Sequence, residues 1–179
     1  MKRSSLITLA ALVLILLCAA AATFVVYRHQ NPEKGSPASQ LLGDTEHVYT
    51  DITGNPVKLS SYEGKVRVVA LWASWCPSCA GELRDLNALA EANGDTLVVL
   101  AVNRKEPKET AQRFLKTVGE VPRLTLIIDQ DDFFYRSVGG YAMPETIVYD
   151  TKGNEVLHAR GDVTREELDR AVQTAREGS

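Results

Sequence analysis

The sequence predicts an α/β fold, a three-layer α/β/α sandwich with a mixed central sheet. Segments with strand-like and helix-like hydrophobic patterns alternate along residues 66–138. The run Val66–Trp72 is apolar at nearly every position, which is typical of a central strand covered on both faces. Two strand-like segments joined by a short turn, 145–149 and 154–160, then introduce antiparallel pairing.

The first half of this domain is predicted from turn residues and periodicity. The segment 46–59 has turn residues at 54–56 and is expected to form a hairpin at the edge of the domain. After strand 66–72, a helix begins near Cys79 and ends near 93–94, with apolar residues on one face. These apolar residues are Leu83, Leu86, Leu89 and Ala90.

The second half continues the alternation and ends on a capped helix. Thr164-x-x-Glu167 is a capping box, and the apolar residues that follow it are spaced as on one face of a helix. The other elements are expected as strand 96–102, helix 108–118, strand 124–128, a short helical piece at 132–138, strand 145–149 and strand 154–160.

The composition fits one globular domain. The chain has 179 residues, of which 45% are hydrophobic and 24% charged, and this length suffices for one core and hardly for two. The formal net charge is −3, and the 23 acidic residues all follow residue 30. Residues 31–179 contain 17 basic against these 23 acidic residues, a net charge of −6. Nucleic acid is therefore not an expected partner, because phosphate binding needs a basic face.

Residues 1–27 are predicted to be a transmembrane signal anchor. Leu6–Val26 has 21 residues without a charge, and about 31 Å of helix matches the hydrocarbon thickness of a bilayer. Lys2 and Arg3 outweigh Arg28, so the positive-inside rule keeps the N-terminus in the cytoplasm. The rest of the chain is then expected outside the cytoplasm, in a single-pass topology.

A cleavable signal peptide is the alternative. Leu6–Cys18 has the length of its apolar region, and the alanines at 19–22 offer cleavage sites. In both cases residues 28–43, rich in Pro, Gly and Ser, are expected to be a flexible linker, and residues 44–179 the folded domain.

A Cys-x-x-Cys pair is the feature of the domain that carries chemistry. The pair Cys76 and Cys79 stands where a buried strand is followed by a helix. The third cysteine, Cys18, lies in the apolar leader, so only two cysteines belong to the domain, and a miniprotein stabilised by several disulfides is excluded. The three histidines are scattered, so a zinc site is not expected, and Ala80 stands where haem attachment needs histidine. No cofactor is predicted. A structural disulfide or half of a metal site is the alternative interpretation.

Disulfide exchange needs a thiolate that attacks and a second thiol that resolves the mixed disulfide. We expect Cys76 at the N-cap of the helix, where free N–H groups and the helix dipole stabilise its thiolate, to be the attacking sulfur. Cys79, expected one turn inside the helix, is then the resolving sulfur.

The stretch Leu71-Trp72-Ala73-Ser74-Trp75-Cys76-Pro77-Ser78-Cys79 resembles the active site of the thioredoxin superfamily, and specifically its membrane-anchored TlpA/ResA-like group. The similarity extends over residues 43–175. It implies that Met143-Pro144 is a cis-proline element that binds the extended chain of a substrate, and that Trp75 offers substrates an apolar surface. It also implies that Glu82 exchanges a proton with the resolving thiol.

The residues alone leave other interpretations open for these three positions. Pro144 also fits a turn proline, Trp75 a core aromatic residue, and Glu82 a solvated glutamate that the helix dipole favours. Compared with thioredoxin, the dipeptide Pro77-Ser78 keeps an N–H and adds a hydroxyl at Ser78. Both groups can donate to the Cys76 thiolate, so we expect this dipeptide to make Cys76 more acidic.

The predicted function is an extracytoplasmic thiol-disulfide oxidoreductase that reduces disulfides of exported proteins, by analogy including apocytochrome c. A membrane thiol electron donor is the second expected partner, and the protein is expected to be a monomer. The alternatives are a disulfide oxidase or isomerase, a peroxiredoxin-like peroxidase and a tethered peptide-binding module without catalysis. Ala73 stands where a peroxidase needs threonine, which disfavours the peroxidase.

Overall fold

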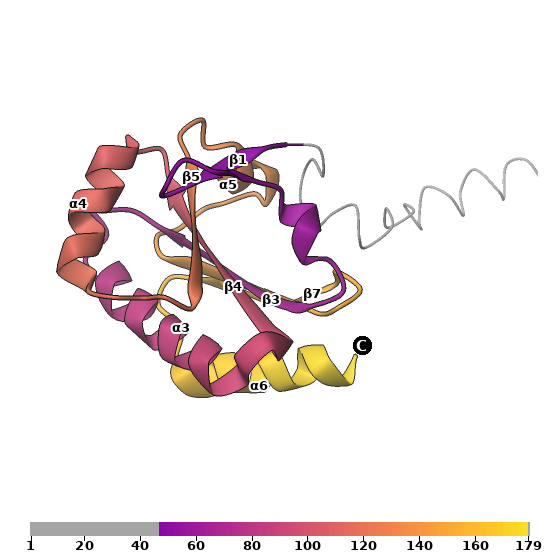
Figure 1. Ribbon diagram of the computed structural model, residues 1–179. Helices are drawn as coiled ribbons and strands as arrows, with labels where there is room; N and C mark the ends of the chain where they lie inside the picture. Colours follow the sequence, from indigo (N-terminus) through magenta and orange to yellow (C-terminus); the bar gives the residue numbers. More distant parts are fainter. Residues whose placement is uncertain (1–46, 179) are drawn as a thin grey trace, which may run out of the picture. The chain divides into compact units, whose positions relative to one another are not determined.

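The computed structural model describes residues 47–178 (Figure 1). The expected membrane anchor or signal peptide, the linker 28–43 and the start of the domain at residue 44 lie outside these residues. Within the described part of the chain, no helix combines the length and the apolar composition needed to cross a membrane.

A seven-stranded mixed sheet forms the centre of the domain, in the order β2-β1-β5-β4-β3-β6-β7. The three middle strands β5, β4 and β3 run parallel, and the other pairs are antiparallel. This confirms the predicted mixed sheet. The strands are β1 (Tyr49–Asp51), β2 (Pro56–Val57), β3 (Val66–Trp72), β4 (Leu97–Arg104), β5 (Leu124–Asp129), β6 (Glu145–Tyr149) and β7 (Glu155–Arg160).

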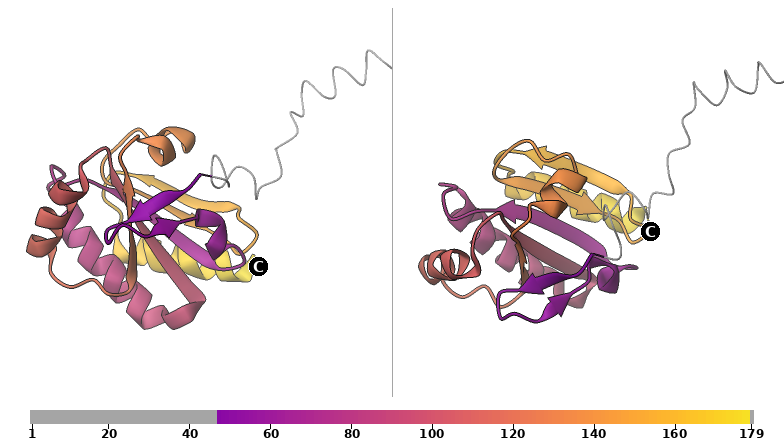
Figure 2. Two further views of the ribbon diagram at one scale, coloured as in Figure 1. Left: turned by 45° about the horizontal axis from the view of Figure 1, so that its top comes forward. Right: turned by 90° about the horizontal axis from the view of Figure 1, so that it is seen from above.

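Helices cover both faces of the sheet. α3 and α6 lie side by side below the sheet in Figure 1, α4 packs against α3, and the short α5 lies on the opposite face. Figure 2 shows the same layers from two further directions. The helices are α3 (Cys79–Asn93), α4 (Lys108–Val118), α5 (Phe133–Ser137) and α6 (Arg165–Glu177), with 3-10 turns η1 (Leu59–Tyr62) and η2 (Gly94–Thr96).

Strand β3 separates two hydrophobic clusters. Because successive side chains point to opposite faces of a sheet, one set of β3 residues packs under α3, α4 and α6, and the other faces α5 and η1. Every residue of β3 is buried, which confirms the predicted central strand. The first set is Val66, Val68, Ala70 and Trp72, and the second includes Val69 and Leu71.

The capping box predicted for the last helix is present. The Thr164 side chain accepts a hydrogen bond from the Glu167 N–H, and the Glu167 carboxylate accepts one from the Thr164 N–H. The helix buries Leu168, Ala171, Val172 and Ala175, as its periodicity predicts. The cap fixes where α6 begins, and α6 then covers β6 and β7.

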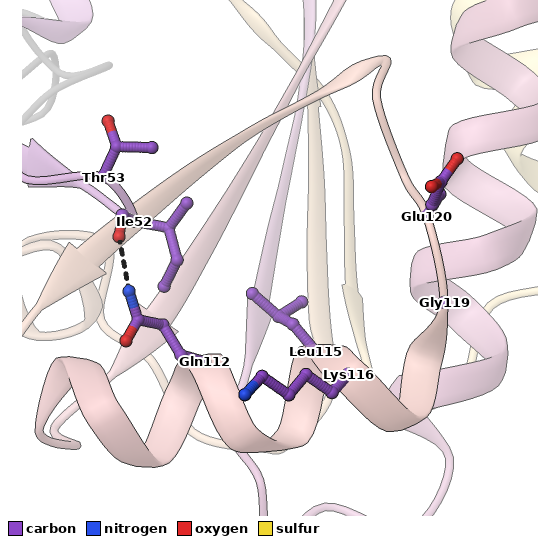
Figure 3. Close-up of a pocket in the computed structure, with 7 residues that line it drawn as sticks. All are labelled: Ile52, Thr53, Gln112, Leu115, Lys116, Gly119 and Glu120. Carbon is purple, nitrogen blue, oxygen red and sulfur yellow. Dashed lines mark hydrogen bonds between the residues drawn. The ribbon is translucent and has the colours of Figure 1, made fainter.

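A groove of about 650 Å³ lies between α4 and the turn that follows β1 (Figure 3). Gln112 spans one end of it, where its Nε2 donates to the Ile52 carbonyl at 3.1 Å. Leu115 and Lys116 of α4 line the same groove. None of the residues predicted to act in redox chemistry lines this groove, so it is separate from the candidate active site.

Candidate active site

The sheet brings the cysteine segment next to the proline segment. β3 and β6 pair antiparallel, and Leu71 is opposite Glu145. The chain that leaves β3 continues into Cys76, and the residue that enters β6 is Pro144. Two segments far apart in the sequence therefore emerge at the same end of the sheet.

Cys76 and Cys79 form a disulfide with a Cα–Cα distance of 5.5 Å. Cys79 is fully buried and Cys76 is 2% exposed, whereas the neighbouring Trp75 is 60% exposed. Of the two cysteines, Cys76 is thus the slightly more exposed one, and it directly follows the exposed Trp75. A thiol that approaches from solvent meets Cys76 first.

Cys76 lies outside the helix, contrary to the prediction that it occupies the N-cap. The N-cap is Ser78, whose carbonyl accepts from the Gly81 and Glu82 N–H groups at 3.0 and 3.1 Å. Cys79 is accordingly the first residue of α3 rather than one turn inside it. The physical reason lies in the backbone hydrogen bonds: the first helical bonds go to the Ser78 carbonyl, whereas the Cys76 N–H closes a separate turn onto the Ala73 carbonyl at 3.2 Å.

The Ser78 hydroxyl lies close to the sulfur of Cys76. Its Oγ lies 4.0 Å from the Cys76 Sγ while the cysteines are joined in a disulfide. Pro77, between them, is exposed. The geometry leaves the hydroxyl within reach of a thiolate at Cys76 once the disulfide opens.

Glu82 is a largely buried carboxyl on the first turn of α3. Its Oε1 accepts a hydrogen bond from the Thr146 hydroxyl of β6 at 2.5 Å. Burial raises the pKa of Glu82 to about 7; the charges of Asp162 and Asp85 also raise it, and the Thr146 hydrogen bond opposes them. Residues three apart on a helix are neighbours, so this carboxyl lies on the same side of α3 as Cys79.

A cavity of about 230 Å³ reaches Glu82 from the surface. Ser78 of the cysteine segment lines it, together with the exposed carboxylates of Asp85 and Asp162. Glu82 therefore faces a cavity that is lined in part by polar side chains.

The peptide bond between Met143 and Pro144 is cis. Pro144 is buried, and its carbonyl accepts from the Gly161 N–H at 2.9 Å. Met143 is partly buried and packs against both hydrophobic clusters, one of which contains Cys76 and Cys79. The proline segment thus packs against the hydrophobic cluster that contains the cysteine pair.

Glu145 holds the loop that precedes this proline, a role that periodicity did not reveal. The fully buried carboxylate accepts hydrogen bonds from the Tyr141 and Ala142 N–H groups at 2.9 and 3.1 Å. Its other oxygen lies 2.5 Å from the His158 Nε2 of β7. A carboxylate at the first position of a buried strand was the only sign of this in the sequence.

A second buried acid, Glu106, was also missed. It lies 7% exposed between β4 and α4. Its Oε2 accepts from the Ser74 N–H, and its Oε1 accepts from the Ser74 hydroxyl at 2.5 Å. Glu106 therefore holds the segment that leads into Cys76.

No set of three or more His, Cys, Asp and Glu side chains within residues 47–178 is arranged to hold a metal ion. Near the cysteine segment, Glu106 accepts hydrogen bonds from Ser74 and Glu82 accepts one from Thr146. Of these two carboxyls, Glu82 has a pKa raised to about 7, which suits proton exchange near neutral pH.

Comparison with known proteins assigns the family. The model of the Redoxin family matches residues 25–174. The chain belongs to the Redoxin family. This agrees with the resemblance to thioredoxin-like proteins that the residues around the cysteines indicated.

Relatives within the family share one activity. A thiol-disulfide oxidoreductase ResA from Geobacillus kaustophilus is 28% identical over 176 residues, which cover 97% of each chain. A thiol:disulfide interchange protein DsbE from Tatumella citrea is 34% identical over 163 residues, 87% of this chain and 85% of the relative. The Redoxin protein described here is a thiol-disulfide oxidoreductase of this ResA- and DsbE-like kind.

Solved structures agree with the fold. The structure of DsbF from MTB, in mixed oxidised and reduced forms, has a TM-score of 0.68 at 25% identity and covers 77% of this chain and 98% of its own. A secreted Mycobacterium tuberculosis disulfide oxidoreductase homologous to E. coli DsbE has a TM-score of 0.64 at 21% identity, covering 73% and 96%. The thioredoxin-like α/β architecture is therefore shared.

Proposed function

We propose that this oxidoreductase reduces disulfide bonds in exported client proteins and that Cys76 and Cys79 are its catalytic dithiol. The observation that carries the proposal is the position of the cysteine pair beside Glu82, whose pKa of about 7 suits proton exchange at neutral pH. Cys76, the more accessible sulfur, attacks, and the buried Cys79 resolves.

The reaction then proceeds in two exchanges. The Cys76 thiolate attacks one sulfur of the client disulfide, which forms a mixed disulfide and releases the first client thiolate. Glu82 takes the proton of the Cys79 thiol, and the new thiolate attacks the Cys76 sulfur. This forms the Cys76–Cys79 disulfide and releases the second client thiolate, which takes up a proton. The client gains two electrons and the dithiol loses them.

The client segment is proposed to bind between Trp75 and the Met143-Pro144 element. Trp75 projects into solvent beside Cys76 and offers apolar surface at small cost in conformational entropy. Pro144 directly precedes β6, the strand next to β3, so an extended chain that lies along Pro144 passes the cysteine pair. An extended, unfolded segment is therefore the form of client that suits this surface.

The proposed place of the reaction is outside the cytoplasm, with residues 6–26 as the membrane anchor. There a reductant must be reduced again after each turnover, so a membrane thiol electron donor is proposed as a partner. Apocytochrome c, whose haem-attachment cysteines must be reduced, is the proposed client. Cell fractionation with mass measurement tests the anchor, because a soluble product that starts near Thr23 contradicts it.

The reduction potential of the Cys76–Cys79 couple tests the proposed direction. We expect a value nearer to the about −270 mV of thioredoxin than to the about −120 mV of DsbA. The measurement equilibrates the full-length protein with dithiol redox buffers and quantifies free thiols. A potential well above the glutathione couple would instead favour the disulfide oxidase or isomerase.

Substitution of Ser78 tests the proposed tuning of Cys76 by the Pro77-Ser78 dipeptide. Loss of a hydrogen bond to a thiolate costs on the order of one pH unit. We expect Ser78→Pro, which removes both the N–H and the hydroxyl, to raise the pH midpoint of Cys76 alkylation by about one to two units. Ser78→Ala removes the hydroxyl alone and separates the two donors. An unchanged midpoint in Ser78→Pro would refute the tuning.

A further inference from the structure

The carboxylate of Glu106 accepts three hydrogen bonds, two of them from Ser74 in the segment that leads to Cys76. Its Oε2 accepts from the Ser74 N–H at 2.8 Å and from the Asn103 Nδ2 at 2.8 Å, and its Oε1 accepts from the Ser74 hydroxyl. All three donors are neutral. Burial of a carboxylate costs free energy that such hydrogen bonds only partly offset, so a hydrophobic residue at this place would be the simpler way to stabilise the fold.

The network connects the sheet to the reactive sulfur. Asn103 is fully buried at the end of β4, opposite Trp72 in the β3–β4 register. From there Glu106 reaches across to Ser74, two residues before Cys76. The Cys76 N–H closes a turn onto the Ala73 carbonyl at 3.2 Å. Ser74 lies inside this turn, so its position determines where Trp75 and Cys76 point.

We propose that Glu106 is a positioning residue for disulfide exchange. It accepts hydrogen bonds from the Ser74 N–H and the Ser74 hydroxyl and thereby fixes the Ala73–Cys76 turn, so that the Cys76 sulfur meets a client disulfide in line for attack. Exchange demands a near-linear arrangement of three sulfurs, and a small loss of alignment slows it strongly. The inference rests on the proposed role of Cys76 as the attacking sulfur.

The test compares Glu106→Ala, Glu106→Gln and the control Glu109→Ala, an exposed acid three residues further on. The measured quantity is the second-order rate at which the reduced full-length protein exchanges with a disulfide-containing peptide, per folded molecule. The second readout is the pH midpoint of Cys76 alkylation by iodoacetamide, with the labelled cysteine identified by peptide mapping.

We expect Glu106→Ala to slow exchange about tenfold, equivalent to about 1.4 kcal/mol of activation free energy. The pH midpoint of alkylation should stay unchanged. Glu106→Gln keeps an acceptor oxygen for Ser74 and should remain within about threefold of the natural protein. Glu109→Ala should match the natural protein in both readouts.

Two results would overturn the proposal. Equal exchange rates per folded molecule in Glu106→Ala and the natural protein would mean that Glu106 only stabilises the fold. A Glu106→Gln rate as low as that of Glu106→Ala, with a shifted pH midpoint, would mean that its charge acts on the thiolate instead. Should Glu106→Ala not fold, Ser74→Ala removes the hydroxyl from the other side and must itself slow exchange.

Failure of the proposed function gives a different result. If peptide mapping of the natural protein finds Cys79 labelled before Cys76, the assignment of the attacking sulfur is wrong, whatever the Glu106 variants do. If Cys76 is labelled first and the Glu106 variants are unchanged, only the positioning role is wrong.

Discussion

Cys79→Ala will accumulate mixed disulfides with client proteins through Cys76, and its turnover will fall by about a thousandfold or more. The reason is that the first exchange needs only the Cys76 thiolate, while release of the client needs the second thiol. Alanine is the suitable replacement because Cys79 is fully buried among apolar side chains, where a serine hydroxyl would lack a partner. Non-reducing electrophoresis after rapid acid quenching measures the adducts, and mass spectrometry identifies the clients.

The matched control is Cys76→Ala, which should lose turnover equally and form no adducts. Thermal melting of both variants in the reduced state checks that the comparison is made on folded protein. Adducts in Cys76→Ala and none in Cys79→Ala would contradict the prediction, because they would mean that Cys79 attacks and Cys76 resolves. The chemical class of the trapped clients then tests the proposed exported substrates directly.

Glu82→Gln will stabilise the protein above neutral pH. In the unfolded chain the carboxyl ionises near its ordinary pKa of 4.5, whereas burial raises the pKa of the folded state to about 7. Unfolding therefore releases a proton between these values, and the contribution of Glu82 to stability is lost as the pH rises through this window. The difference between the folded and unfolded pKa of Glu82 lowers the free energy of unfolding by up to about 3 kcal/mol at high pH, since one pKa unit corresponds to about 1.4 kcal/mol.

Chemical denaturation at a series of pH values measures this effect. The gap in free energy of unfolding between Glu82→Gln and the natural protein should be small near about pH 4 and grow to about 3 kcal/mol near about pH 8. Glu91→Gln, an exposed glutamate on the same helix, should show no such growth. A gap that stays constant with pH would show that burial does not shift the carboxyl. In exchange assays, Glu82→Gln should slow the release of client while leaving the attack of Cys76 intact.

The parts of the fold that the sequence predicts well are those with strong local patterns. β3 begins and ends where its apolar run does, because every one of its residues is buried on one face or the other. α6 begins at Arg165 because Thr164 and Glu167 cap it reciprocally. α3 begins at Cys79, near where its apolar periodicity predicts, but its N-cap is Ser78 and not Cys76, since the first helical hydrogen bonds go to the Ser78 carbonyl.

The candidate site was predictable only where a motif marks it. Cys76, Cys79 and Pro144 stand in recognisable local sequence, and the structure brings their segments together through the pairing of β3 with β6. Glu106 and Glu145 have no such marker, because their partners Ser74 and His158 lie on other segments of the chain. Similarly, the raised pKa of Glu82 arises from burial against β6, which the order of residues along α3 does not reveal.

The loop before Pro144 is held by hydrogen bonds that do not involve the cysteine segment. Glu145 of β6, itself bonded to His158 of β7, holds the N–H groups of Tyr141 and Ala142. Glu106 holds the cysteine segment from the other side of β3. Met143 packs against the cluster that contains Cys76 and Cys79, and a side chain at Gly140 would clash with the Tyr135 ring. Tyr141 and Ala142 are therefore the positions at which evolution or an engineer can vary this loop with the least disturbance of the cysteine pair.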